Sequence, residues 1–431
     1  MEEYHVQKVK RLRGTIEVPG DKSVSHRAIM LASLSDTPVV VKNFLFSKDC
    51  LSTIDCFRSL GIVISYSEAS GCVWVSGKGI HGLKEPENIL DAGNSGTTMR
   101  LMSGILSGQD FFSVITGDDS LRQRPMARII DPLKQMGAQL YSRNKNRKAP
   151  IAVLPAGKLQ GQNFMNHIAS AQIKSAQLLA GLFAEGPTSV TEPYISRNHT
   201  ELMFENFGVD VNVTDTTVTI TPPEKLTAPA EVIVPGDISS AAYWLVAATV
   251  APDSEVTLKN VGINPTRTGI IDALTMMGAN IEIQNRRYFG REEVGDLVVR
   301  SAELHGVTIS HEMIPRLIDE IPVLAVAALF AKGMTRIEGA SELKVKETDR
   351  LSGIAGELTK LGAKFVVTED GLIINGPQTL SHSICHSRFD HRLAMATAIA
   401  GLLGQGAEIA EAECVEISYP TFFKHLEQIS S

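Results

Sequence analysis

The sequence predicts an α/β protein made of two similar domains, each containing three repeats. The first observation is a repeated segment: VPGD begins at Val18 and again at Val234, about half the chain apart. The second is a pattern in which an amphipathic helix ends at a glycine and a short strand follows, as in FRSLGIVI and ELTKLGAKF. The third is a series of apolar helices, each of which leads into a strand-like stretch. Together they predict units of roughly seventy residues, three before Val234 and three after it.

The glycines of the second pattern are expected to end their helices, because a left-handed residue after a helix costs glycine little. They are Gly61, Gly137, Gly208, Gly278 and Gly362. A sixth helix, FFKHLEQI, ends the chain without a following strand. One large α/β domain with chance similarity between its halves is the alternative to two domains.

The apolar helices are expected to be buried, and stretches such as TPVVVKNF, SEVTLKNV and GMTRIEGA follow them as strands. Their start sites carry unusual polar residues. The helices are expected to follow Lys22, Gly96, Ser170, Ser239, Pro322 and Asp390.

The composition excludes several classes of protein. The chain has 431 residues, of which 43% are hydrophobic, and a net charge of −7 argues against nucleic acid as its main partner. No apolar stretch is long enough to span a bilayer, and the amino end has no secretory signal. The five cysteines are scattered without metal-ligand spacing, which favours free thiols in a reducing compartment. We expect a cytoplasmic protein that does not bind membranes.

Polar side chains gather where the apolar helices begin, and helix amino ends favour anions. If the helices of each domain run side by side, these ends lie on one face, and two such faces across a hinge would form a positive cleft. The residues are Lys22, Ser23 and Arg27; Asn94, Gly96 and Arg100; Ser170, Gln172 and Lys174; Asp319 and Glu320; and Asp390, His391 and Arg392.

Two loops add charge: DDSLRQRPMAR carries Arg122, Arg124 and Arg128, and LKVKETDR carries Lys346, Glu347 and Arg350. Cations beside one or two carboxylates suit chemistry on a polyanionic substrate. Each motif alone has a simpler interpretation. KVKETDR alone is typical of a solvated helix face, and GNSGTT alone is only a weak signal for a phosphate-binding loop. Asp319 alone suits an N-cap. His199 and His391 alone are typical of ordinary core or surface histidines.

The combined motifs VPGDKSVSHRA, DAGNSGTTMR, LRQRP, SAQIKSA, IDEIP, KETDR and FDHRLAMA resemble the 5-enolpyruvylshikimate-3-phosphate synthase family, in order and over nearly the whole chain. The resemblance implies two domains of three βαβαββ repeats, the inside-out α/β barrel of the enolpyruvyl transferases. Residues 1–17 plus 235–431 would form one discontinuous domain and residues 18–234 the other, with the active site in the cleft between them. It also implies a transferase of the shikimate pathway to chorismate and the aromatic amino acids. Such an enzyme moves the enolpyruvyl group of phosphoenolpyruvate to the 5-hydroxyl of shikimate 3-phosphate and releases phosphate.

The resemblance also assigns residues, and it implies small-molecule substrates, no metal, no organic cofactor and a monomer. Shikimate 3-phosphate would be held by Lys22, Ser23, Arg27, Ser170, Gln172, Arg197, Asp319 and Lys346. Phosphoenolpyruvate would be surrounded by Lys22, Gly96, Arg124, Gln172, Arg350 and Arg392, and Asn94 would be a further substrate-binding residue. Asp319 would accept the proton of the 5-hydroxyl, while Glu347 and Lys22 are the candidates for proton transfer at the enolpyruvyl group.

The motifs SRNHTE, SAQIK and NPTR resemble the second class of the family, which is associated with glyphosate tolerance. Ala171 stands at a position where the other class often has Ser. Gly96 stands where some second-class members have Ala, and Ile417 stands where other members of the family have Lys. We expect partial tolerance of glyphosate. Two alternative functions remain. One is a UDP-N-acetylglucosamine enolpyruvyl transferase, a family that has a reactive cysteine in the loop where this chain has Asp119. The other is a catalytically silent phosphate-binding protein of the same fold.

Overall fold

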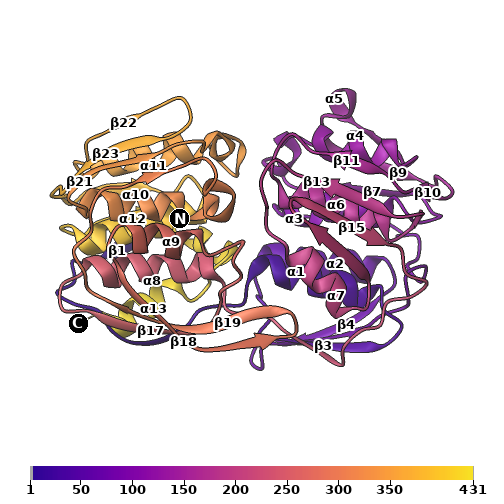
Figure 1. Cartoon of the computed structure of the whole chain (residues 1–431), viewed down its shortest axis with the longest axis horizontal. Coiled ribbons are helices and arrows are strands. Elements are labelled where there is room, and N and C mark those ends of the chain that lie inside the picture. The colour runs from indigo at the N-terminus through magenta and orange to yellow at the C-terminus, as the bar shows by residue number, and fades with distance from the viewer. Residues whose placement is uncertain (1–2, 431) are drawn as a thin grey trace. The chain divides into compact units, whose positions relative to one another are not determined.

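The computed structural model describes residues 3–430, which divide into two compact units (Figure 1). Unit 1 comprises the stretch ending at Pro19, Pro235–Arg287 and the stretch from Glu293 onward. Unit 2 comprises Gly20–Val234 and the short segment Tyr288–Glu292, which the boundaries expected from sequence do not include. Two of the four boundaries therefore fall inside the VPGD segments, and the other two flank Tyr288–Glu292.

Unit 2 contains three four-stranded sheets of one topology, in which the first strand is parallel to the second and the remaining pairs are antiparallel. A small parallel pair joins β10 (Leu159–Gln160) to β12 (Ala184–Glu185). The strand orders are β16 (Glu231–Ile233), β3 (Pro38–Lys42), β5 (Cys72–Ser76), β4 (Val63–Ser67); β6 (Leu90–Asp91), β7 (Ser113–Thr116), β9 (Lys148–Leu154), β8 (Gln139–Ser142); and β11 (Asn163–Met165), β13 (Thr188–Thr191), β15 (Thr217–Thr221), β14 (Asp210–Thr214).

The helices of unit 2 are of two kinds. Three are buried almost throughout: α1 (Lys22–Ser33), α3 (Gly96–Leu106) and α6 (Ala171–Gly181). The others bury one face only, as an amphipathic helix over a sheet does. They are α2 (Lys48–Ser59), α4 (Ala127–Gln135) and α7 (His199–Asn206), with a single turn at α5 (Arg143–Asn146) and a 3-10 turn at Leu121–Gln123.

Unit 1 repeats this arrangement with two four-stranded sheets and one three-stranded sheet. The orders are β18 (Asn280–Phe289), β19 (Glu292–Arg300), β17 (Glu255–Gly262), β2 (Arg13–Glu17); β20 (Thr308–Ile309), β21 (Gly333–Ile337), β23 (Leu372–Gly376), β22 (Phe365–Val367); and β1 (Tyr4–Val6), β25 (Ala407–Ala410), β24 (Ile384–His386). The buried helices are α8 (Ile238–Val250), α10 (Ile321–Phe330) and α12 (His391–Leu403). The outer helices are α9 (Gly269–Met276), α11 (Arg350–Lys360) and α13 (Phe422–Ile429).

Three strands reach their sheets from distant parts of the chain. β16 supplies the first strand of the sheet that begins unit 2, pairing parallel with β3. β2 does the same for unit 1, pairing parallel with β17. β1 pairs with β25 and completes the sheet near α13, the last helix, which has no strand after it. These pairings complete the βαβαββ pattern from segments that no local repeat identifies.

The expected glycine caps and apolar helices are confirmed. All five glycines that end helices have positive φ, between 78° at Gly208 and 101° at Gly278. The six buried helices begin within two residues of the predicted positions. Each unit has its own hydrophobic core, so the alternative of one large domain is wrong. Among the described helices, none is both long and apolar enough to cross a membrane.

Candidate active site

The start of α1 fixes three of the predicted substrate residues in unit 2. Asp21 caps the helix, because its side chain accepts a hydrogen bond from the Val24 amide at 3.0 Å. Lys22 follows, with its Nζ 2.9 Å from Asp49 Oδ2. A cation at the amino end of a helix adds to the positive potential of the free N–H groups there, so this corner favours an anion.

Arg27 lies one turn further along α1 and is buried. Its Nε donates to Thr200 Oγ1 at 2.6 Å, and its Nη2 donates to Ser175 Oγ at 2.7 Å. Burial lowers the pKa of Arg27 to about 10, with repulsion from Arg197 also lowering it, against attraction from Glu201 and Asp21. Arg27 therefore keeps its positive charge at neutral pH and is held in one orientation by neutral hydroxyl groups.

The start of α3 brings Gly96 against two arginines. Ser95 caps the helix by accepting from the Thr98 amide at 3.1 Å. A Cβ built on Gly96 would lie 2.9 Å from Arg100 Nη1 and 3.3 Å from Arg124 Nη1. Arg124 in turn donates from Nη2 to Asn94 Oδ1 at 2.6 Å. The absence of a side chain at Gly96 thus leaves room for both guanidinium groups.

The start of α6 lies beside the start of α3. Gln172 Oε1 accepts from Arg100 Nη1 at 2.5 Å, and its Nε2 donates to Thr97 Oγ1 at 3.1 Å. Ser170 precedes the helix, but its hydroxyl makes no capping hydrogen bond; its backbone N–H donates to Glu192 Oε1 at 2.8 Å. Gln172 thus links the start of α6 to α3, and Arg27 links α1 to α6 through Ser175.

In unit 1, Asp319 lies among three cations. Its Oδ1 is 3.1 Å from Arg350 Nη1 and 3.3 Å from Lys346 Nζ, and its Oδ2 is 3.9 Å from Arg392 Nη2. The N-cap of α10 is Glu320, and no side chain caps this helix, so the interpretation of Asp319 as an N-cap is wrong. Asp319 is instead the carboxylate at the centre of a basic cluster.

Arg350 and Arg392 are buried around this carboxylate. Arg350 Nε donates to Asp390 Oδ2 at 2.8 Å, and its Nη2 lies 2.5 Å from Glu347 Oε2. Burial alone would lower the pKa of Arg350, but Asp390 and Glu347 raise it above its ordinary value. The KVKETDR segment is therefore not a solvated helix face.

The second VPGD segment differs from the first in its source of positive charge. Asp237 caps α8 by accepting from the Ser239 amide at 2.9 Å. Arg267, from the NPTR motif, is buried and lies with its Nη2 3.2 Å from Asp237 Oδ1. The cation that Lys22 provides in one copy thus comes from a separate loop in the other, and here it pairs with the cap.

Several partners of the predicted residues escaped the reasoning from sequence. Asp49 binds Lys22, and Ser175 and Thr200 bind Arg27, across separations that no local pattern reveals. Asp390 was visible only as part of FDHR, and its contact with Arg350 depends on the tertiary structure. Among residues 3–430, no group of three or more His, Cys, Asp or Glu side chains is placed to hold a metal ion.

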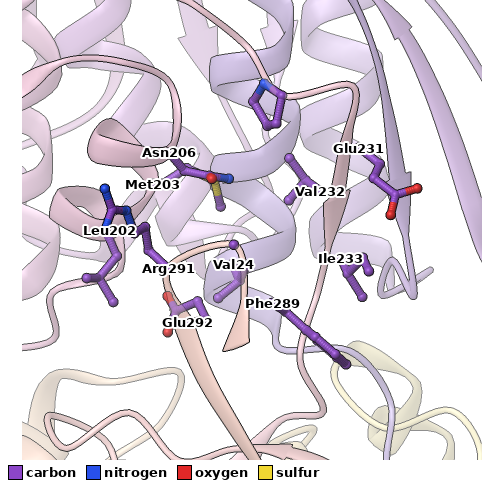
Figure 2. Close-up of a pocket in the computed structure, with 12 residues that line it drawn as sticks. Val24, Leu202, Met203, Asn206, Glu231, Val232, Ile233, Phe289, Arg291 and Glu292 are labelled. Carbon is purple, nitrogen blue, oxygen red and sulfur yellow. The ribbon is translucent and has the colours of Figure 1, made fainter. Parts of the chain in front are cut away.

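Unit 2 also contains a cavity of about 250 Å³, which Val24 of α1 helps to line (Figure 2). It is bordered by α7, by β16 and by the segment Phe289–Glu292 at the tip of the β18–β19 hairpin. His199 lies beside it with Nδ1 2.7 Å from Glu292 Oε1, and both side chains are buried. His199 is therefore a hydrogen-bonded core residue, as the simpler interpretation expected.

Comparison with known proteins identifies the family. A model of EPSP synthase (3-phosphoshikimate 1-carboxyvinyltransferase) matches residues 6–426. The chain belongs to the EPSP synthase family. A 3-phosphoshikimate 1-carboxyvinyltransferase of Desulforamulus reducens is 51% identical over 425 residues, which cover 98% of each chain.

Solved structures of EPSP synthase relatives agree. An EPSP synthase from Acinetobacter baumannii is 41% identical, with a TM-score of 0.89 over 100% of this chain and 98% of that one. The enolpyruvyl transferase NikO from Streptomyces tendae has a TM-score of 0.81 at 18% identity, over 99% of this chain and 96% of that one, which shows the shared fold alone. The predicted family and the enolpyruvyl transferase fold are confirmed.

One loop position bears on the alternative function considered from sequence, that of a UDP-N-acetylglucosamine enolpyruvyl transferase. Asp119, which stands where the nucleotide-sugar enzymes would have a reactive cysteine, is exposed and forms an ion pair with Arg122. The position therefore carries a carboxylate and not a thiol.

Proposed function

We propose that this chain transfers the enolpyruvyl group of phosphoenolpyruvate to the 5-hydroxyl of shikimate 3-phosphate, the activity for which its relatives are named. The reaction makes the protein a transferase of the shikimate pathway, which leads to the aromatic amino acids. The observation that carries the proposal is Asp319, one carboxylate held within 4 Å of three cations in a chain of this family. A carboxylate in that setting can accept a proton while the cations bind an anionic reactant.

We assign shikimate 3-phosphate to the residues that the helix starts of unit 2 gather. Lys22, Ser23, Arg27, Ser170, Gln172 and Arg197 would bind it, with Asp319 and Lys346 of unit 1 near its 5-hydroxyl. The positive charge that Arg27 keeps when buried supports a phosphate partner, because a buried cation gains most from a ligand of opposite charge. The substrate would thus bond to residues of both units.

Phosphoenolpyruvate is assigned to Lys22, Asn94, Gly96, Arg124, Gln172, Arg350 and Arg392. The contacts of Arg124 with Asn94 and of Arg350 with Asp390 support this assignment, because they hold the guanidinium groups in fixed directions. Two planar guanidinium groups can bind carboxylate and phosphate with paired hydrogen bonds.

The proposed reaction balances its protons with groups of this chain. Asp319 accepts the proton of the 5-hydroxyl as that oxygen bonds to C2 of phosphoenolpyruvate, while C3 receives a proton. C3 then loses a proton, the bond from C2 to the phosphate oxygen breaks, and inorganic phosphate leaves. Glu347 and Lys22 are the proposed proton carriers at C3. The cations stabilise the phosphate throughout.

A phosphate-release assay tests the proposal. Purified protein is incubated with phosphoenolpyruvate and either shikimate 3-phosphate or UDP-N-acetylglucosamine, and phosphate is measured over time. We expect turnover with shikimate 3-phosphate alone. Turnover only with the nucleotide sugar, or with neither acceptor, would overturn it.

We also propose that the protein works as a monomer in the cytoplasm. The five cysteines are free thiols, which suits a reducing compartment. Size-exclusion chromatography with light scattering tests the monomer, because a mass near 46.6 kDa is expected.

A further inference from the structure

A buried lysine in α6 joins two carboxylates beneath the proposed phosphate site. The Lys174 side chain is 2% exposed. Its Nζ lies 2.7 Å from Glu201 Oε1 on α7 and 3.1 Å from Glu192 Oε2, which follows β13. Burial alone would lower the pKa of Lys174, but Glu201 and Glu192 raise it, so the group is a charged ion cluster. Such a cluster is costly to desolvate.

An apolar side chain could fill this position of α6 at lower cost, as Ile173, Leu178 and Leu179 do at other buried positions of the helix. Buried ion clusters contribute little net stability compared with apolar packing of equal volume. Stability alone therefore does not explain why Lys174 and the two glutamates occupy this buried position. Its contacts with the neighbouring loops supply one.

The two carboxylates differ in what else they bind. Glu192 Oε1 accepts from the backbone N–H of Ser170 at 2.8 Å. Glu192 Oε2 accepts from Ser196 Oγ at 2.6 Å and, at 3.4 Å, from the Ser196 backbone N–H. Glu192 thus ties the start of α6 to the loop that carries Arg197.

Lys174 reinforces this tie, since its Nζ also donates to the Ser196 carbonyl at 3.4 Å. Glu201 also binds the lysine, from the first turn of α7, next to Thr200, which binds Arg27. Glu192 thus accepts hydrogen bonds from both Ser170 and Ser196, and Lys174 donates one to Ser196.

We propose that Glu192, with Lys174 as its counterion, is a positioning residue for the phosphate group of shikimate 3-phosphate. It holds Ser170 and the Ser196–Arg197 segment at the separation in which both reach the same phosphate. This inference rests on the proposed function. It adds a residue that touches no substrate but sets the geometry of those that do, and small displacements of such groups weaken binding strongly.

The structure offers a matched pair of variants for the test. Glu192→Gln and Glu201→Gln each remove one negative charge from the same lysine, and both side chains are almost fully buried. The glutamine at 192 can no longer accept from both serines, because one of its two terminal atoms is a donor. Lost orientation at 192 should raise KM for shikimate 3-phosphate about tenfold or more, which corresponds to about 1.4 kcal/mol. At 201 we expect a change of less than about threefold, because the hydrogen bonds to Ser170 and Ser196 run through Glu192 and Lys174.

KM for phosphoenolpyruvate and kcat are measured in the same assays, and thermal unfolding reports stability. Glu192→Gln should leave KM for phosphoenolpyruvate within about twofold, because a positioning role concerns one substrate only. Inhibition by shikimate, which lacks the phosphate, should be equal in wild type and Glu192→Gln. Equal effects of the two variants on shikimate 3-phosphate, or an equal rise in KM for both substrates, would overturn the inference.

Ser196→Ala covers the case in which Glu192→Gln does not fold, since it removes one hydroxyl donor and leaves the ion cluster intact. It should raise KM for shikimate 3-phosphate by about threefold or more and leave KM for phosphoenolpyruvate unchanged; no rise would refute the positioning role. Wild-type turnover is established first. Its absence refutes the proposed function, whereas normal wild-type turnover with indifferent variants refutes this inference alone.

Discussion

Asp319→Asn is the sharpest test of the proposed chemistry, because it removes the base and keeps its shape. The carboxamide can still accept from Arg350 and Lys346, which lie 3.1 and 3.3 Å from Oδ1 in the native protein. Arg350 also keeps its contacts with Asp390 at 2.8 Å and Glu347 at 2.5 Å. The basic cluster should therefore remain folded around the new side chain.

The size of the effect follows from these contacts. Loss of a general base slows turnover about 10²–10⁴-fold, or roughly 2.7–5.5 kcal/mol in activation free energy. Binding should not suffer, because removing a negative charge from three cations favours an anionic ligand. We therefore expect kcat to fall by that factor, while the Kd of shikimate 3-phosphate stays within about threefold.

Phosphate release gives kcat, titration calorimetry gives the Kd, and Asp349→Asn is the control. Asp349 is two residues after Glu347, and it caps α11 because its side chain accepts a hydrogen bond from the Ser352 amide at 3.1 Å. Its substitution changes one carboxylate of the same loop and should leave kcat within about twofold. If Asp319→Asn turns over at the wild-type rate, Asp319 is not the base. If it loses affinity but not kcat, Asp319 is a binding residue.

Three other perturbations have expected outcomes. Gly96→Ala places a methyl group 2.9 Å from Arg100 Nη1 and 3.3 Å from Arg124 Nη1, so both guanidinium groups must shift. We expect the Ki of glyphosate, measured in competition with phosphoenolpyruvate, to rise about tenfold. An unchanged Ki would show that Gly96 does not border the glyphosate site. His26 is buried with Nδ1 2.7 Å from Thr53 Oγ1, and burial, followed by Lys22 and Arg27, lowers its pKa well below 6.5. Below pH 6.5 the unfolded chain therefore binds a proton at His26 that the folded protein does not bind. The free energy of unfolding should then fall by up to about 1.4 kcal/mol for each pH unit below 6.5. Urea unfolding of His26→Asn at several pH values should lack this part of the pH dependence, and an equal pH dependence in the variant and the wild type would contradict the assignment. Asp49→Asn leaves Lys22 without its partner at 2.9 Å, so the unliganded protein should melt about 2–6 °C lower while inorganic phosphate binds more tightly; weaker phosphate binding would mean that Asp49 serves to orient Lys22.

The sequence by itself determined the features that depend on neighbouring residues. Helix ends at Gly208 and Gly278 were predictable, because a residue with positive φ after a helix favours glycine whatever surrounds it. The starts of α1 and α12 were predicted within two residues, and the structure shows Asp21 and Asp390 as their N-caps. The family was predictable as well, since its motifs occur in order along the chain and the comparisons confirm it.

The tertiary structure decided which polar groups meet. Asp319 and Arg350 are 31 positions apart, and the sequence left an N-cap as the simpler interpretation of Asp319, which the fold places among three cations. The pairing of β16 with β3 and the hydrogen bond from the Ser170 backbone N–H to Glu192 likewise join segments that are distant in the sequence, and no periodicity records them. Hydrophobic patterns report which face of an element is buried, and that information is local. The partner of a buried charge is chosen by packing between distant elements, where an unpaired charge would be costly, and this choice is made only in the folded protein.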